Sequence, residues 1–395
     1  YSRGGADILR RCLAGSTEVV DAATGRRVTL TEIAAAPEVW IGREVFALDL
    51  KTQKIVRQPI AAVYHNGVQE VFEVTTRTGR RIQATATHLF YTLMGWKPLG
   101  AFQPGDRIGL AGTLPIKHDC GITDAQIKLT AYLLGDGHLS TRKPANCYFC
   151  NSDPALIADF NRCVTELFGR PAPVDYQLHP GRQSVGYVRV GCLSEFNAWI
   201  DSHIQRAHSH DKVIPDWVDA LSRDQLRLFI GTLWSTDGTF DTSIGHADYT
   251  STSRRMIEQL QHLLLRLGIV ALFNIKTIQY QGQPHRSYRA QITGREEMLK
   301  FHDRVQPFLS RRKQEKAEIC YRMIRAKASN QSKHTIPAEV IGLIANAKYA
   351  SGMTWAEIDQ AVGMRPGTMT SGLNFKIPPR RALARHRDLN FATAF

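Results

Sequence analysis

The chain has 395 residues, with 50 Lys and Arg against 36 Asp and Glu, which gives a formal net charge of +14. This length allows two or three buried cores and excludes a single small module. The basic excess favours a polyanionic partner such as nucleic acid, because Lys and Arg neutralise phosphates and release counterions. Excess charge that serves only solubility is the alternative.

The cysteines and the hydropathy indicate a reducing, soluble environment. The seven Cys are odd in number and irregularly spaced, which argues against a disulfide framework, so we expect a cytoplasmic protein. Cys147 and Cys150 have metal-ligand spacing, but no matching pair follows, so we expect two thiols on a strand and no structural zinc. No segment approaches the ~20 apolar residues that cross a bilayer, and no signal peptide is recognisable. The first residue is Tyr1, which indicates a fragment of a longer precursor.

The first hundred residues predict an all-β unit. Short alternating segments, bounded by Gly and Pro, are typical of strands, and we expect them at 43–50, 69–75, 81–85, 97–99 and 104–108. Cys12 opens this region, and Thr85 and His88 follow the third of these segments.

Three signals here resemble the N-terminal part of an intein, a Hint-type splicing domain: Cys12-Leu-Ala-Gly, Thr85-x-x-His88 and Gly105-Asp106. The resemblance implies an N–S acyl shift, in which the Cys12 thiol converts the Arg11–Cys12 amide into a thioester. His88 would protonate the leaving nitrogen and Thr85 would hold the peptide. Taken singly, Cys12 is more often a small buried apolar residue and His88 a hydrogen-bonded strand-end histidine.

Residues 1–11 would then be a remnant of the host protein. They resemble a segment of the catalytic α subunit of bacterial DNA polymerase III, which would be attached covalently at the N-terminus. An unrelated helical arm is the alternative.

Two matched segments, 129–137 and 230–238, each predict a helix that closes on Asp-Gly. Small residues leave room for close helix packing: Ala131, Gly135, Gly231, Thr232 and Thr236. Asp136 and Asp237 would lie at helix C-termini, where the macrodipole disfavours an anion and a divalent cation would compensate.

These segments resemble the LAGLIDADG (DOD-type) homing endonucleases. The resemblance implies two helices at a pseudo-twofold interface, with Asp136 and Asp237 as catalytic acids that bind Mg²⁺ (or Mn²⁺) and together make a double-strand break. Lys212, in Lys-x-Ile-Pro, and Lys313 are expected near the cleavage centre, where a cation stabilises charge on the phosphate or orients water. Alternatively, Lys212-Val-Ile-Pro215 marks only the start of a helix.

Each acidic helix is followed by a similar run of predicted elements. After the first we expect strands at 146–150 and 186–190 around a helix at 154–168; after the second, a helix at 256–268 and strands at 271–276 and 287–293. One face of each sheet would pack on helices and the other would present basic residues to DNA: Arg182, Arg189, Lys276, Arg286 and Arg289. Any one of these is more often a solvated charge.

The C-terminal region departs from the intein pattern. Residues 353–373 predict a helix-turn-helix-like hairpin, with a turn at Gly363 and a second helix from Pro366. Asn390 lacks the preceding His and the following nucleophile of a splice junction, so no C-terminal splicing motif is recognisable. An incomplete Hint fold would leave unpaired sheet edges.

We therefore predict a multi-domain monomer in which an all-β splicing domain accompanies an α+β endonuclease with two pseudo-symmetric halves. The expected boundaries are a host remnant at 1–11, a Hint domain at 12–118, the endonuclease at 119–326 (halves 119–218 and 219–326), a helix-turn-helix-like segment at 327–380 and a tail at 381–395. Double-stranded DNA is the expected partner. A non-cleaving DNA-binding regulator and a hedgehog-type autoprocessing protein are the competing readings.

Overall fold

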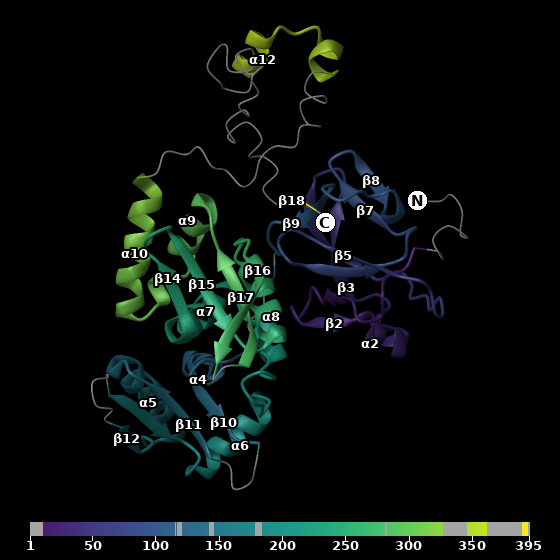
Figure 1. The fold of residues 1–395 in the computed structure, drawn as a ribbon. Coiled ribbons are helices and arrows are strands. Elements are labelled where there is room, and N and C mark those ends of the chain that lie inside the picture. Colours follow the sequence, from purple (N-terminus) through teal and green to yellow (C-terminus); the bar gives the residue numbers. More distant parts are fainter. Residues whose placement is uncertain are drawn as a thin grey trace.

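The computed structural model describes residues 11–114, 116, 121–141, 146–177, 184–280, 283–326, 346–361 and 389–393. Within these ranges, no helix combines the length and the apolar character that a membrane crossing requires. Figure 1 shows three parts: a β-rich N-terminal unit, a larger α+β body, and a small helical segment that includes α12 (Trp355–Ala361).

The N-terminal unit is built from antiparallel hairpins, and the strands expected there are confirmed. Successive strands pair as β1-β2, β3-β4, β5-β6 and β7-β8. Two short helices, α2 (Leu30–Ala35) and α3 (Pro37–Trp40), follow the first hairpin. The strands are β1 (Glu18–Val20), β2 (Arg27–Thr29), β3 (Glu44–Asp49), β4 (Lys54–Pro59), β5 (Phe72–Thr75), β6 (Arg81–Ala84), β7 (Leu89–Thr92), β8 (Gly95–Pro98) and β9 (Arg107–Ala111).

The tail of the chain returns to this unit, which corrects one expectation. Strand β18 (Leu389–Thr393) pairs antiparallel with β9, in a register that sets Leu389 opposite Ala111 and Thr393 opposite Arg107 (Figure 1). The prediction of an unpaired edge is therefore wrong for β9. The partner strand comes from a segment almost 280 positions away along the sequence, and local patterns do not report such a pairing.

The α+β body begins with a helix, a four-stranded antiparallel sheet and two helices that cover it. The sheet has the order β10-β11-β13-β12. Pro154 at the first position and Gly169, at φ 73°, bound α5, so the helix predicted at 154–168 is confirmed. The elements are α4 (Asp124–Leu134), β10 (Gly137–Leu139), β11 (Cys147–Asn151), α5 (Pro154–Phe168), β12 (Val174–Gln177), β13 (Val185–Arg189) and α6 (Ser194–His203).

A second run of elements follows, and its sheet has the order β14-β15-β17-β16. Its core is aromatic, since Trp234 lies 4.9 Å from Phe301 and 5.6 Å from Tyr249, measured between ring centroids. The elements are α7 (Arg223–Asp237), β14 (Gly238–Asp241), β15 (His246–Ser251), α8 (Arg254–Arg266), β16 (Leu272–Tyr280), β17 (Gln283–Ile292), α9 (Arg295–Arg304) and α10 (Arg311–Ala326). The helix and strands expected here are confirmed.

Helices α4 and α7 pack against each other at the junction of the two sheets (Figure 1). Gly135 permits this approach, because a Cβ there would lie 2.0 Å from the Thr236 Oγ1. Gly231 has a different role from the one expected, since a Cβ there would meet Phe308 at 2.4 Å. The small residues thus allow close packing, but not all of them face the other acidic helix.

The N-terminal unit also contacts the body through a seam beside α8 and β16. The Arg27 Nε lies 2.8 Å from the Asp219 Oδ2, and both side chains are buried. The Phe273 amide donates to the Thr78 carbonyl at 2.9 Å, and the Gln261 Nε2 donates to the same carbonyl at 2.8 Å. Main-chain and charged contacts together join the two parts.

Of the predicted helix-turn-helix, the structure describes the first helix, α12. A capping box formed by Thr354 and Glu357 begins this helix. Residues 362–388, where the second helix is predicted, lie outside the described residues.

Candidate functional site

The two acids stand at the ends of the packed helices. Asp136 follows the Gly135 cap of α4, and Asp237 is the last residue of α7. The two carboxyl groups lie close enough together for the charge of Asp237 to act on Asp136. The structure thus brings together the two residues that the sequence matched, 101 positions apart.

Both carboxyl groups resist ionisation. Desolvation by burial, followed by the charge of Asp237, raises the pKa of Asp136 to about 7. Desolvation also raises the pKa of Asp237, while Lys212 and Lys313 oppose the rise. Asp237 keeps exposed surface, so its carboxyl is less completely desolvated than a buried one would be. Two carboxyls that disfavour each other's charge form an environment that a cation would stabilise.

The predicted lysines contact helix-end carbonyls. The Lys212 ammonium is buried and donates to the carbonyls of Leu133 and Leu134, both at 3.0 Å, of Gly135 at 3.1 Å and of Gly137 at 2.8 Å. Burial lowers its pKa to about 8. Lys212 therefore supplies part of the positive charge that the C-terminus of α4 requires.

Lys313 repeats this arrangement at the other helix. Its ammonium donates to the Thr236 carbonyl at 3.2 Å and to the Gly238 carbonyl. Burial is the main cause that lowers its pKa. Lys212 and Lys313 are separated by the same 101 positions as the two acids, so acid and lysine recur as a unit.

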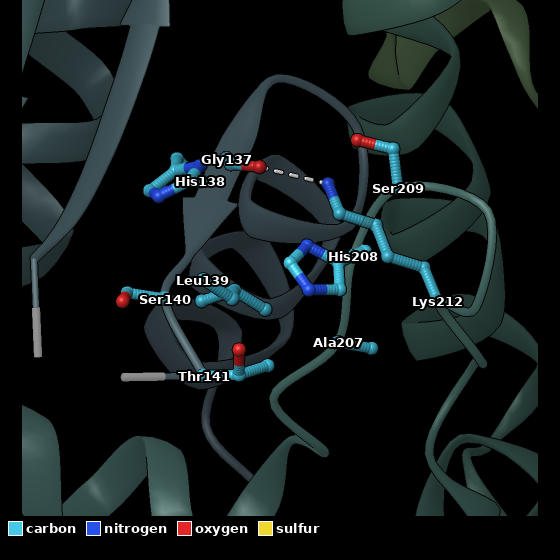
Figure 2. A pocket seen from close by; sticks show the side chains of 9 residues that line it. All are labelled: Gly137, His138, Leu139, Ser140, Thr141, Ala207, His208, Ser209 and Lys212. Carbon is cyan, nitrogen blue, oxygen red and sulfur yellow. Dashed lines mark hydrogen bonds between the residues drawn. The ribbon is translucent and has the colours of Figure 1, made fainter. Parts of the chain in front are cut away.

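A cavity of about 310 Å³ opens beside Lys212 (Figure 2). Its lining includes His138, Ser140, His208 and Ser209, and the ammonium of Lys212 reaches across it to the Gly137 carbonyl. A second cavity, of about 380 Å³, is lined by Asp136 together with Lys313, Lys316 and Arg312. Each lysine therefore borders a polar cavity wide enough for a phosphate group.

Two site residues escaped sequence reasoning. The Asn151 Nδ2 donates to the Asp136 Oδ2 at 2.6 Å, and Tyr249 is buried near Asp237, where burial and the charge of that carboxyl raise the pKa of the Tyr249 hydroxyl. Both stand on the second strand after an acidic helix, β11 and β15. Aligning the two repeats would have shown polar groups there, but nothing local marks either residue as a partner of an acid.

The open faces of the two sheets differ in chemistry. On the first sheet His138 stacks on Tyr148 at 4.9 Å, and Tyr148 lies 5.6 Å from Tyr187. On the second, Lys276 is exposed. Arg286 is exposed as well, but the register pairs it with Thr277 and so places it on the opposite face of the sheet from Lys276, which corrects the expectation for Arg286. Two of the expected basic residues are already paired, Arg189 with Asp175 and Arg289 with Asp248, and Arg182 lies outside the described residues.

The predicted splicing residues also come together, at the start of the N-terminal unit. The Cys12 amide donates to the Thr85 Oγ1 at 3.1 Å, and the Thr85 amide donates to the Cys12 carbonyl at 3.0 Å. Burial lowers the pKa of His88, and a hydrogen bond with the main chain of Arg11 opposes that change. The His88 imidazole therefore lies beside the Arg11–Cys12 junction.

Comparison with known proteins adds sequence and structural relatives. A model described as LAGLIDADG-like domain matches residues 224–306. Replicative DNA helicase DnaB of Rhodothermus marinus is 28% identical over 97% of this chain and 40% of its own length. Protein RecA of Mycobacterium tuberculosis (strain ATCC 25618 / H37Rv) is 23% identical over 93% of this chain and 47% of its own length. The replication factor C small subunit of Methanocaldococcus jannaschii is 25% identical over 75% of this chain and 16% of its own length. The chain spans less than half the length of these relatives.

Two solved structures are also similar. A DnaB intein from Synechocystis sp. PCC 6803 is 30% identical over 26% of this chain and 69% of its own, with a TM-score of 0.24. The I-DmoI complex with DNA and Mn is 14% identical over 46% of this chain and 96% of its own, with a TM-score of 0.32. The chain therefore contains a LAGLIDADG-like segment and is similar to inteins and to homing endonucleases.

Proposed function

We propose that this chain is an intein-borne, site-specific double-strand DNA endonuclease that also carries out the first step of protein splicing. The observation that carries the endonuclease is the repeated unit of acid, helix end and lysine: Asp136 with Lys212, and Asp237 with Lys313. Two such units predict two strand cuts. The two sheets have corresponding strand orders, which supports pseudo-symmetric halves at 119–218 and 219–326.

The acid pair fits a divalent cation. Among the described residues no cluster of three or more His, Cys, Asp or Glu side chains occurs, but Mg²⁺ and Mn²⁺ often bind through one or two carboxylates and several waters. Asp136 and Asp237 would hold the ion. Burial and the charge of Asp237 raise the pKa of Asp136, and a cation would stabilise its ionised form. A bound cation would act as a Lewis acid and lower the pKa of a bound water.

The chain's own residues would prepare the site. Asn151 orients the Asp136 carboxylate by donating to it at 2.6 Å. Lys212 and Lys313 place positive charge beside the acids, where it would stabilise the phosphate as charge develops. The aromatic row on the first sheet and the exposed Lys276 on the second would contact DNA.

A second activity is favoured by the geometry at Cys12. The Cys12 thiol would attack the Arg11 carbonyl, with Thr85 fixing the peptide and His88 giving a proton to the leaving nitrogen. The comparisons support an intervening sequence, because proteins named DnaB, RecA and replication factor C share this segment over only part of their lengths. DnaB thus becomes a candidate host, and the polymerase α subunit stays a prediction.

The remaining assignments complete the proposal. The splicing domain would span 12–118, the helix-turn-helix-like segment 327–380, and the protein would act as a monomer on double-stranded DNA. The basic net charge of +14 supports DNA as the partner.

The test uses the purified chain, Mg²⁺ and two plasmids, one with an uninterrupted DnaB gene and one with the polymerase α-subunit gene. We expect the parent protein to linearise one of the two plasmids. Asp136→Asn and Asp237→Asn should each abolish this cleavage, whereas Cys12→Ala should cleave as the parent does. DNA binding without cleavage by the parent would instead favour a regulator.

A further inference from the structure

A loop side chain contacts the thiol of Cys12. The Asn66 Nδ2 donates to the Cys12 Sγ at 3.0 Å, although the two residues are 54 positions apart. Asn66 belongs to the loop between β4 and β5, whereas Cys12 precedes β1. The contact therefore depends on the tertiary fold.

The loop turns this one side chain inward. From Tyr64 to Glu73 every residue is exposed except Asn66, which is half-buried. Gly67 follows at φ 64°, a conformation that glycine adopts without steric cost and that allows the chain to reverse. The Gln69 Nε2 donates to the Asn66 carbonyl at 3.0 Å and closes the turn.

The rest of Cys12 is held by a different element. The Cys12 amide donates to the Thr85 Oγ1 at 3.1 Å, and the Thr85 amide donates to the Cys12 carbonyl at 3.0 Å. These two contacts fix only the main chain of Cys12. The side-chain amide of Asn66, in contrast, donates to the sulfur of Cys12. Such a donor stabilises negative charge on sulfur and restricts rotation of the thiol.

We propose that Asn66 is a further catalytic residue of the acyl shift, which prepares the Cys12 sulfur for attack. The inference rests on the proposed function. In the step, the thiol loses its proton to solvent, the Sγ bonds the Arg11 carbonyl carbon, and the C–N bond breaks. The Cys12 nitrogen, protonated by His88, becomes a free amine. Asn66 acts before the bond forms, by favouring an oriented thiolate.

The test is thiol-induced cleavage of the full chain, followed by mass spectrometry of the released peptide 1–11. We expect Asn66→Ala to slow release by roughly tenfold, as expected for the loss of a hydrogen bond to a charged group. Asn66→Asp keeps the shape but faces the sulfur with a carboxylate, so release should be slower still at pH 8. His65→Ala, an exposed neighbour in the same loop, should cleave at the parent rate.

A second measurement follows alkylation of the Cys12 peptide by iodoacetamide against pH. The midpoint of the profile should move to higher pH in Asn66→Ala and further in Asn66→Asp. Parent-like rates and profiles in both variants would overturn the inference, as would slow cleavage with an unchanged profile and a lower melting temperature. If the parent releases no peptide, the proposed splicing chemistry fails, while the alkylation profiles still decide whether Asn66 acts on the sulfur.

Discussion

Ionisation of Asp136 lowers the stability of the folded protein. Burial of its carboxyl and the charge of Asp237 raise the pKa of Asp136 to about 7, well above the usual value of an aspartate. Ionisation in the folded state is unfavourable relative to the unfolded chain, and this penalty grows as the pH rises from about 4 to about 7. The site therefore destabilises the folded protein more at neutral pH than in acid.

Asp136→Asn should therefore raise the melting temperature of the protein in EDTA, and more at pH 8 than at pH 5. Scanning calorimetry at both pH values measures this. Mg²⁺ at pH 8 should stabilise the parent but not the variant. Asp153→Asn, which replaces one good helix N-cap by another, is the matched control and should respond equally at both pH values. Equal stabilisation of Asp136→Asn at both would contradict the argument.

The lysines at the helix ends should differ in their contribution to stability. Lys212→Met removes a buried ammonium from four carbonyls, whereas Lys313→Met affects two. An unsatisfied buried polar group costs about 1–3 kcal/mol, so we expect Lys212→Met to lower the free energy of unfolding by about 2 kcal/mol or more and Lys313→Met by less. Urea unfolding measures both. An equal loss would show that the number of carbonyl contacts does not set the cost.

At the scale of elements, the packing of α4 on α7 allows little change. Gly135→Ala would bring a Cβ to 2.0 Å from the Thr236 Oγ1 and 2.6 Å from its Cβ. The helices would have to separate, which we expect to cost about 1–3 kcal/mol and to displace Asp136, with loss of cleavage. Gly100→Ala, whose nearest contact is Ala86 at 3.4 Å, is the control. Unfolding curves and plasmid cleavage test both variants, and a Gly135→Ala enzyme with parent activity would contradict the packing argument.

The sequence predicted most elements here because their signals are local. Pro154 and Gly169 bracket α5, and two similar helices each deliver an acid. The contacts of Lys212 with four carbonyls, and of Asn151 with Asp136, join residues of different elements and depend on the completed fold. The β18–β9 pairing was missed for the same reason, since nothing near Asn390 identifies its partner.

At the scale of the molecule, the N-terminal unit and the α+β body are coupled by a buried ion pair between Arg27 and Asp219. Arg27 contacts both Asp219 at 2.8 Å and Glu18 at 3.1 Å, so its loss would leave a buried carboxylate unpaired. Arg27→Leu should cost about 3–5 kcal/mol, while the Arg27→Leu, Asp219→Leu double variant should recover part of the loss. Urea unfolding followed by Trp fluorescence supplies this double-mutant cycle. Additive losses would show that the pair is not coupled.

The pairing of β18 with β9 has a consequence for how such a chain evolves. Ala111 and Leu389 face each other across the ladder, so the polypeptide leaves the β unit and re-enters it at one edge. The α+β body lies between these two strands in the sequence. A gene deletion that joined the two strands through a short hairpin turn would remove the α+β body and keep the ladder. The α+β body is in this sense an insertion between two paired strands, and its loss would expose the seam at which Arg27 now meets Asp219.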